Sequence, residues 1–386
     1  MILLMNDLVS TSLKNVFYSF IFFGGVFYVL SCDSEIQKVE QPSLNLIHTK
    51  DVYLKLDNET SSYNSFYQLL DYDSLTLLAF FNRLNFNLYI YDLSNGELRQ
   101  KMKFEEKGPN GLGERVTSFN ILEYDSVMFH SYYRSELIVS NFSGEVESRF
   151  KMRNDDLDFV PVSSHNKPFL GLESNIYVYS GKTSNDLDFS NTPILLRYNI
   201  KNKKSEDTGV RLPDFYKTRA SEFIPGDLSE PSLTSNQEGG ILLLSFPLDD
   251  SVKVISANGE VKSVFFGINS HELESPLKKD NGARDPLGKL KDLLTFSRYG
   301  AVKYDPYRKI YLRTYVDKTP QHLLDQDILK GDQKIVFADS SLNVIGVADF
   351  IGTEDLHFSK EGMLQVIYNN NQEDSLQIKV FSYDWF

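Results

Sequence analysis

Cysteine and tryptophan are nearly absent from this chain of 386 residues: Cys32 and Trp385 are the single examples. One cysteine excludes an internal disulfide and a cysteine-rich zinc site. Basic residues are also in the minority, since 40 lysines and arginines face 53 aspartates and glutamates. The resulting net charge of −13 makes binding to the phosphate backbone of nucleic acids an unfavourable function for this protein.

Catalytic motifs are scarce as well. The chain has no GxSxG nucleophile elbow and no phosphate-binding glycine loop, and its six histidines lack the spacing of a metal site. We therefore expect no cofactor and no metal. Pairs of acidic residues are plentiful, and carboxylates around a channel are the machinery of some glycosidases. A carbohydrate-active enzyme consequently stays open as an alternative function.

Only one long apolar run is present, VFYSFIFFGGVFYVL at 16–30, with fifteen uncharged residues. A membrane-spanning helix needs ~20 apolar residues, whereas a secretory signal needs fewer. The run ends in Val-Leu-Ser-Cys at 29–32, which resembles the bacterial lipobox, the signal in which the cysteine becomes a lipidated first residue. The pattern predicts a signal peptide over 1–31 and lipidation of Cys32. The alternative is an uncleaved membrane helix.

The segment after Cys32 is polar, and we interpret 32–48 as a tether. From a lipidated cysteine we expect a location in the cell envelope, with the lipid attaching the protein to the outer membrane. Asp33 resembles an inner-membrane retention signal in some bacteria and a surface-export signal in others. The periplasmic or surface side therefore stays open.

Phenylalanine and tyrosine dominate the aromatic residues, with 28 and 22 copies, and both favour half-buried strands. A unit of alternating strands and Asn-Gly or Ser-Gly turns recurs six times. Its middle strands begin near 88, 137, 194, 252, 334 and 378. Period-2 alternation with such turns predicts antiparallel hairpins, and a short extra strand precedes most copies.

Four strands in each of six units predict an all-β fold, a six-bladed β-propeller over 49–386. The last copy has no room for an outermost strand, while DVYLKL at 51–56 stands alone before the first copy. We expect this N-terminal strand to complete the last blade and to close the ring, leaving no unpaired edge. An open β-sandwich or two tandem β-domains are the alternatives.

The lipobox, the Tyr- and Phe-rich units and FEEKGPNGLGE at 104–114 resemble a Bacteroidota lipoprotein family of unknown function. Its members are six-bladed propellers of the TolB-like type, and the resemblance covers nearly all of the chain after the signal peptide. It implies the fold. It implies no activity and no site residues.

Loops at one end of a propeller are the expected place for a function, because a rigid scaffold positions them. Arg83 and Arg134 occupy the same slot in the first two units, and Tyr133 adjoins Arg134. Two guanidinium groups at a channel mouth suit a carboxylate or a sulfate. The alternative for both is an ordinary surface arginine. Asn110 belongs to a Gly-Pro-Asn-Gly cluster that is either a ligand loop or a tight turn between blades.

Arg298 and Tyr299 are further candidates for binding, and they follow a long insertion at 271–294. Leucines at helical intervals, Leu287, Leu290, Leu293 and Leu294, predict a short amphipathic helix there, serving as a lid, as a docking element or simply as packing. Together these features favour a non-catalytic, membrane-tethered module that binds a protein, a peptide or a glycan at the channel mouth. A structural subunit of an envelope complex is a third possibility.

Overall fold

The computed structural model describes residues 41–386 with gaps at 62, 63, 65, 73, 74, 124, 153–159, 173, 182–192, 215, 217–227, 269–285, 329, 330, 353, 369–373 and 384–386. The predicted signal peptide, Cys32 and the first part of the tether lie outside the described residues. None of the helices in the described part of the chain has the length and hydropathy needed to cross a bilayer.

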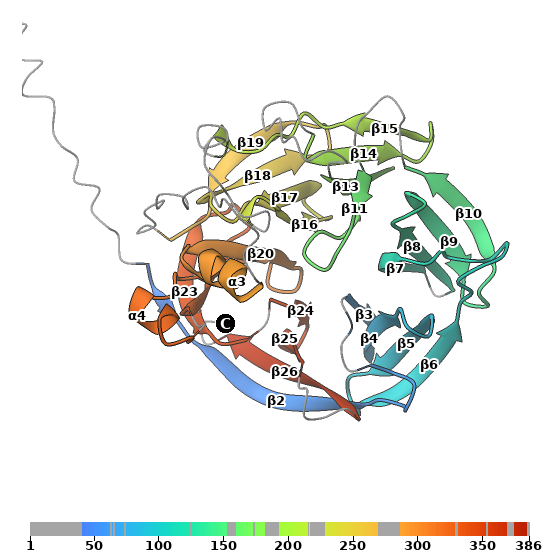
Figure 1. The fold of residues 1–386 in the computed structure, drawn as a ribbon, viewed down its shortest axis with the longest axis horizontal. Coiled ribbons are helices and arrows are strands. Elements are labelled where there is room, and N and C mark those ends of the chain that lie inside the picture. The colour runs from blue at the N-terminus through green and yellow to red at the C-terminus, as the bar shows by residue number, and fades with distance from the viewer. Residues whose placement is uncertain are drawn as a thin grey trace, which may run out of the picture. The chain divides into compact units, whose positions relative to one another are not determined.

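The first three blades follow one another along the chain (Figure 1). Blade 1 contains β3 (Tyr67–Tyr72), β4 (Leu75–Asn82), β5 (Asn87–Asp92) and β6 (Glu97–Lys103). Blade 2 contains β7 (Val116–Glu123), β8 (Ser126–Ser131), β9 (Glu136–Asn141) and β10 (Val146–Lys151). Blade 3 contains β11 (Val160–Val162), β12 (Leu170–Leu172), β13 (Asn175–Gly181), β14 (Leu195–Asn199) and β15 (Lys204–Asp207).

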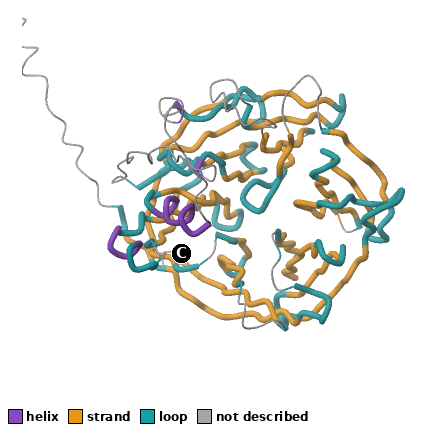
Figure 2. Tube along the Cα trace, viewed as in Figure 1, coloured by secondary structure: helices purple, strands orange, loops and turns teal. Residues whose placement is uncertain are grey.

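The other three blades complete the ring. Blade 4 contains β16 (Ser232–Asn236), β17 (Ile241–Ser245), β18 (Ser251–Ser256) and β19 (Val261–Phe265). Blade 5 contains β20 (Arg298–Asp305), β21 (Ile310–Val316), β22 (Gln333–Ala338), β23 (Val344–Phe350) and β1 (Ser43–Leu44). Blade 6 contains β24 (Leu356–Ser359), β25 (Gly362–Ile367), β26 (Ser375–Tyr383) and β2 (Leu46–Lys55). The described helices are α3 (Pro286–Leu294) and α4 (Gln321–Leu324), and Figure 2 shows strands as the main regular element of the ring.

The N-terminal strand closes the ring as the sequence predicts. β2 pairs with β26 in antiparallel register, with Val52 opposite Ile378 and Leu54 opposite Leu376. β1 is an addition that the sequence did not predict, because a two-residue strand has no alternation to recognise. It pairs with β23 in parallel, so that blade 5 gains a fifth strand. Both strands begin within the span that the sequence assigned to the tether.

Apolar side chains fill the interface between each pair of neighbouring blades. The described residues form six buried clusters, one for each of the six interfaces around the ring. β4 shows how alternation produces this arrangement, because successive strand residues point to opposite faces of a sheet. Its Leu77 and Phe81 pack against blade 2, while Phe80 packs against blade 6. The six-bladed β-propeller is thus confirmed, with a core distributed around the axis.

Candidate binding site at the mouth of the channel

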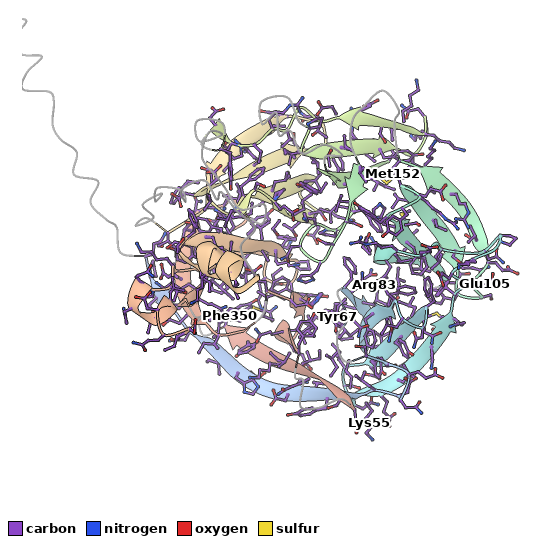
Figure 3. The ribbon with its side chains drawn as sticks, in the orientation of Figure 1. Lys55, Tyr67, Arg83, Glu105, Met152 and Phe350 are labelled. Carbon is purple, nitrogen blue, oxygen red and sulfur yellow. The ribbon has the colours of Figure 1, made fainter. Side chains whose placement is uncertain are left out.

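A cavity of about 550 Å³ opens at one end of the central axis, and we call it the mouth cavity. It lies where the inner strands β7, β16 and β20 begin, and every blade contributes to its wall. Figure 3 shows Arg83, one of its residues, near the middle of the ring, with Lys55 and Glu105 at the periphery. The side chains on which the argument depends are Arg83, Arg115, Lys167, Glu230, Arg298 and Glu354.

The turn between β4 and β5 positions Arg83. Asn82 is buried and its Oδ1 accepts a hydrogen bond from the backbone N–H of Leu84 over 2.9 Å, a local bond that favours a tight turn. Phe86 closes the turn with a φ of 55° and anchors it in the core between blades 1 and 2. The arginine at the tip is exposed. It has no hydrogen bond or ion pair with any residue that the structure describes.

Positive charge exceeds negative charge in the mouth cavity. Arg83, Arg115, Lys167 and Arg298 line it together with two carboxylates. The carboxylates already have partners: Glu230 forms an ion pair with Lys167, and Glu354 accepts from the Asn166 amide over 3.3 Å. Arg83, which has no hydrogen bond or ion pair with the described residues, therefore remains available for an anion from solution.

Two tyrosines flank Arg115. Its guanidinium lies 4.8 Å from the ring centre of Tyr132 and 5.9 Å from that of Tyr133, distances typical of cation–π contacts. Tyr132 lines the mouth cavity, whereas Tyr133 is 66% exposed and lines a neighbouring hollow of about 640 Å³. Arg83 and Arg115 line both spaces. The mouth cavity thus continues outward over blades 1 and 2, and we call this extension the side hollow.

A break in the inner strand of blade 3 supplies the floor of the mouth cavity. β11 and β12 both pair with β13, and residues 163–169 between them form a projection that we call the channel loop. Ser164 and Lys167 exchange backbone hydrogen bonds of 2.9 and 3.1 Å, which tighten the loop. Pro168 has no N–H to offer a ladder, so it suits the break. The channel loop was not predicted, because apart from Pro168 nothing in its sequence distinguishes it from a hairpin turn.

The channel loop reaches across the axis to blade 6. Nδ1 of His165 lies 3.2 Å from Oδ1 of the buried Asp355, which also contacts His357 Nε2 at 2.9 Å and the Tyr368 hydroxyl. Burial acts to raise the pKa of Asp355, but the imidazoles and the hydroxyl outweigh it and lower the pKa to about 2. Burial lowers the pKa of His165 to about 4, so the imidazole beside Asp355 is neutral at neutral pH.

A serine and a histidine also meet at the wall, but their setting is structural. Ser163 Oγ lies 2.6 Å from Nδ1 of His130, the contact expected of a nucleophile and its base. Ser163 is only 2% exposed and also bonds the hydroxyl of Ser118 at 2.5 Å. No carboxylate within the described residues orients the imidazole of His130. The pair therefore ties blades 2 and 3 together.

The structure brings several predicted site residues together. Arg83, Arg298 and Tyr299 all line the mouth cavity, and Tyr133 lines the side hollow. Tyr299 is buried, donates to Asp250 Oδ1 over 2.6 Å, and has its pKa raised by burial. It is therefore part of the supporting wall. Arg298 lies at the start of β20 with its side chain half-buried.

Arg134 and Asn110 lie elsewhere. Nη1 of Arg134 donates to the backbone oxygen of Gly111 over 3.1 Å, so this arginine is directed to the loop after blade 1 and not to the mouth cavity. Arg83 and Arg134 therefore do not line one cavity, and the structure does not place them around a single anion. Oδ1 of Asn110 accepts from Val146 N–H over 3.1 Å and ties the same loop to β10. This is the role of a turn between blades.

Sequence reasoning missed Arg115 and Lys167. Arg115 precedes a predicted strand and carries no motif, and Lys167 lies in the channel loop that was not foreseen. The predicted helix is present as α3, where Leu294 is buried, Leu293 lines the mouth cavity and Leu290 is 41% exposed. The side chain of Leu287 lies outside the described set.

Comparisons with known proteins place the fold. A family model described as "Domain of unknown function (DUF4221)" matches residues 43–346. The crystal structure of a DUF4221 member from Bacteroides vulgatus ATCC 8482 is 18% identical, with a TM-score of 0.74, and the match covers 89% of this chain and 99% of that one. A Bacteroides fragilis NCTC 9343 protein is 11% identical, with a TM-score of 0.55, over 87% and 94% of the two chains. No curated protein matches the chain.

Proposed function

The chain belongs to the DUF4221 family, a domain of unknown function, so its role has to be inferred from its own side chains, and we propose that it is a non-catalytic binding module that holds an anionic glycan in the mouth cavity. The observation that carries the proposal is the surplus of cationic side chains there. A carboxylate or a sulfate of the glycan would pair with Arg83 and Arg298. Such charge-assisted bonds are stronger than neutral ones, and arginine can form two at once.

The shape of the site supports an extended ligand. The side hollow shares Arg83 and Arg115 with the mouth cavity, so an anionic unit in the cavity can continue outward over the ring of Tyr133. An exposed aromatic ring offers a flat apolar surface to the face of a sugar. An acidic peptide would use the same arginines, and the experiment below distinguishes the two ligands.

The proposed location is the cell envelope, with the propeller attached to a membrane through a lipid on Cys32. This part rests on the sequence alone. An envelope protein meets acidic polysaccharides from its surroundings, which is consistent with a cationic site on an otherwise acidic protein.

Glycoside hydrolysis is the less favoured function. It needs two carboxyl groups on either side of the bond to be broken. The carboxylates that line the mouth cavity among the described residues, Glu230 and Glu354, are each engaged by a neighbour, the first by Lys167 and the second by Asn166. That arrangement suits a binding site better than an acid and a base.

Isothermal titration of the purified protein with trigalacturonate tests the proposal. We expect saturable binding that weakens as salt is raised, because screening reduces the attraction between exposed charges. Arg83→Gln and Arg298→Gln should each weaken binding by about tenfold, the loss expected for one charged hydrogen bond. Maltotriose, a neutral trisaccharide, should not bind.

Arg134→Gln is the matched control, because this arginine bonds Gly111 and lies outside the mouth cavity. It should bind trigalacturonate as the wild type does. The proposal fails if the wild type binds neither trigalacturonate nor a sulfated oligosaccharide, or if Arg134→Gln loses as much affinity as Arg83→Gln. Preference for a tri-aspartate peptide over both oligosaccharides would reassign the site to acidic peptides.

A further inference from the structure

A second cavity continues along the axis beyond the channel loop (163–169). It has a volume of about 360 Å³, and we call it the channel cavity. Its residues come later on the same inner strands: Thr234 follows Ser232 on β16, and Lys303 follows Gly300 on β20. His165 of the channel loop lines both cavities. The two spaces are therefore successive along the axis, and the loop separates them.

Apolar and polar groups share the wall of the channel cavity about equally. The inner strands of all six blades contribute, and the volume lies at the lower end of the range for small-molecule sites. The phenylalanines and tyrosines in the wall are Phe66, Tyr67, Phe119, Phe169, Tyr304 and Phe358. Figure 3 shows Tyr67 near the middle of the ring. The apolar half of this wall suits the hydrocarbon body of a small ligand.

One amine, that of Lys303, lies in this wall. Lys303 faces the channel cavity from β20, and no hydrogen bond or ion pair links it to any residue in the described part of the chain. Burial lowers the pKa of its amine, an effect that the charges of Asp355 and Glu354 oppose from a distance. A partly buried cation without a contacting counter-ion is unfavourable, because it has lost part of its hydration and gained little in return.

The nearest carboxylates do not serve as that counter-ion. Asp355 is occupied by His165, His357 and Tyr368, which together hold it on the blade 6 side. Glu354 accepts from Asn166 in the channel loop. No carboxylate of the described chain therefore contacts Lys303 directly, which leaves the amine accessible to an anionic ligand.

We propose that the channel cavity is a second binding site, for a small organic monocarboxylate whose carboxylate pairs with Lys303 and whose apolar body packs against the aromatic wall. The site is separate from the glycan site of the mouth cavity. Hydroxyls of Thr234 and Ser235 in the same wall offer further donors to the carboxylate.

Charge and volume restrict the ligand class. Asp355 and Glu354 already place negative charge near Lys303, so a dianion would be repelled more than a monoanion. An inorganic anion would fill little of the cavity and would leave the aromatic wall without contacts. A carboxylic acid with a hydrocarbon body satisfies both the amine and the wall.

Binding of 4-phenylbutyrate, followed by isothermal titration on the purified full chain, tests the inference. The matched neutral probe is 4-phenyl-1-butanol, which keeps the ring and removes the charge. We expect the acid to bind the wild type about tenfold more tightly than the alcohol, the difference expected for a hydrogen-bonded ion pair. Lys303→Met, a neutral residue of similar length, should abolish the preference for the acid.

A variant carrying both Arg83→Gln and Arg298→Gln separates this site from the mouth cavity, and it should bind the acid as the wild type does. The inference is overturned if 4-phenylbutyrate does not bind the wild type saturably at millimolar concentration, or if acid and alcohol bind equally. It is also overturned if Lys303→Met keeps the preference, or if the double arginine variant loses it. The comparison of the two probes on the wild type requires no variant to fold.

Discussion

His130 is a buried imidazole with only one of its two nitrogens satisfied. Nδ1 contacts the hydroxyls of Thr117 and Ser163 at 2.8 and 2.6 Å, whereas Nε2 has no hydrogen-bond partner in the described chain. Burial lowers the pKa of the ring to about 4 from the usual 6.5, because the charged form cannot be hydrated there. His130 is therefore neutral in the folded protein at pH values where an unfolded chain would already be protonated.

Acid should destabilise the fold through this residue. As the pH falls below 6.5, His130 becomes protonated in the unfolded chain, whereas in the folded protein it becomes protonated only near pH 4. The depression corresponds to roughly 3 kcal/mol of unfolding free energy lost between pH 7 and pH 4. His130→Asn keeps a polar group near the position of Nδ1 and removes the titration. Between pH 7 and pH 4, the unfolding free energy of this variant, measured by urea denaturation, should fall less than that of the wild type.

His48→Asn provides the comparison, because the side chain of His48 is 47% exposed on β2. That variant should retain the full pH dependence of the wild type. The same loss between pH 7 and pH 4 in His130→Asn as in the wild type would show that burial of this imidazole does not govern acid stability. Only the slope with pH is compared, so any uniform cost of the substitution does not enter.

Two arginines show which residue roles can be predicted from the sequence and which cannot. Arg83 was identifiable, because it lies in a short polar turn between two apolar strands. Arg313 was not, since it occupies one position in an ordinary alternating strand. In the structure its guanidinium is fully buried and donates to Ser245 Oγ and to the backbone oxygens of Phe246, Asp249, Asp250 and Phe266. Acceptors that lie 47 to 68 residues away in the chain leave no local signal.

At the scale of elements, the strands were predictable and their irregularities were not. β2 was identified because its alternation stands apart from any neighbouring unit and matches the strand missing from blade 6. β1 and the channel loop were not predicted, for two different reasons. β1 is too short for periodicity, and the channel loop interrupts a strand where the sequence shows only Pro168 as a break. The floor of the mouth cavity follows from that interruption and could not be predicted.

The pairing of β2 with β26, which closes the ring, should contribute directly to stability. Leu54 is fully buried in the cluster between blades 6 and 1, whereas its neighbour Tyr53 is 47% exposed on the other face. Leu54→Ala should therefore cost about 2–5 kcal/mol of unfolding free energy, the range for removing a buried leucine side chain. Chemical denaturation followed by fluorescence measures this loss.

Tyr53→Ala is the matched control on the same strand, and its cost should be below about 1 kcal/mol, as is usual for an exposed position. Equal losses for both variants would mean that β2 lies on the surface of the ring and does not seal it. A small loss for Leu54→Ala alone would contradict the closed packing of blades 6 and 1.

At the scale of the whole molecule, the charge of the mouth cavity opposes the charge of the chain. The net charge is −13, yet four cationic side chains gather at one end of the axis. An acidic protein repels polyanions over most of its surface, whereas the cationic side chains of the mouth cavity attract an anionic ligand locally. Composition predicted the repulsion. The local reversal depends in part on Arg115, whose position at the mouth cavity only the fold reveals.

Attachment to a membrane is the last property to test on the whole molecule, and it depends on Cys32, outside the described residues. Cys32→Ala should remove labelling by an alkyne fatty acid and should shift the protein out of the membrane fraction of cells expressing the full chain. Ser31→Ala is the control, since another small residue before the cysteine keeps the lipobox pattern and should preserve labelling. If 16–30 is instead an uncleaved membrane helix, Cys32→Ala will remain in the membrane fraction, because such a helix holds the protein without the thiol. That result would remove the lipid anchor while leaving the propeller and both cavities as they are.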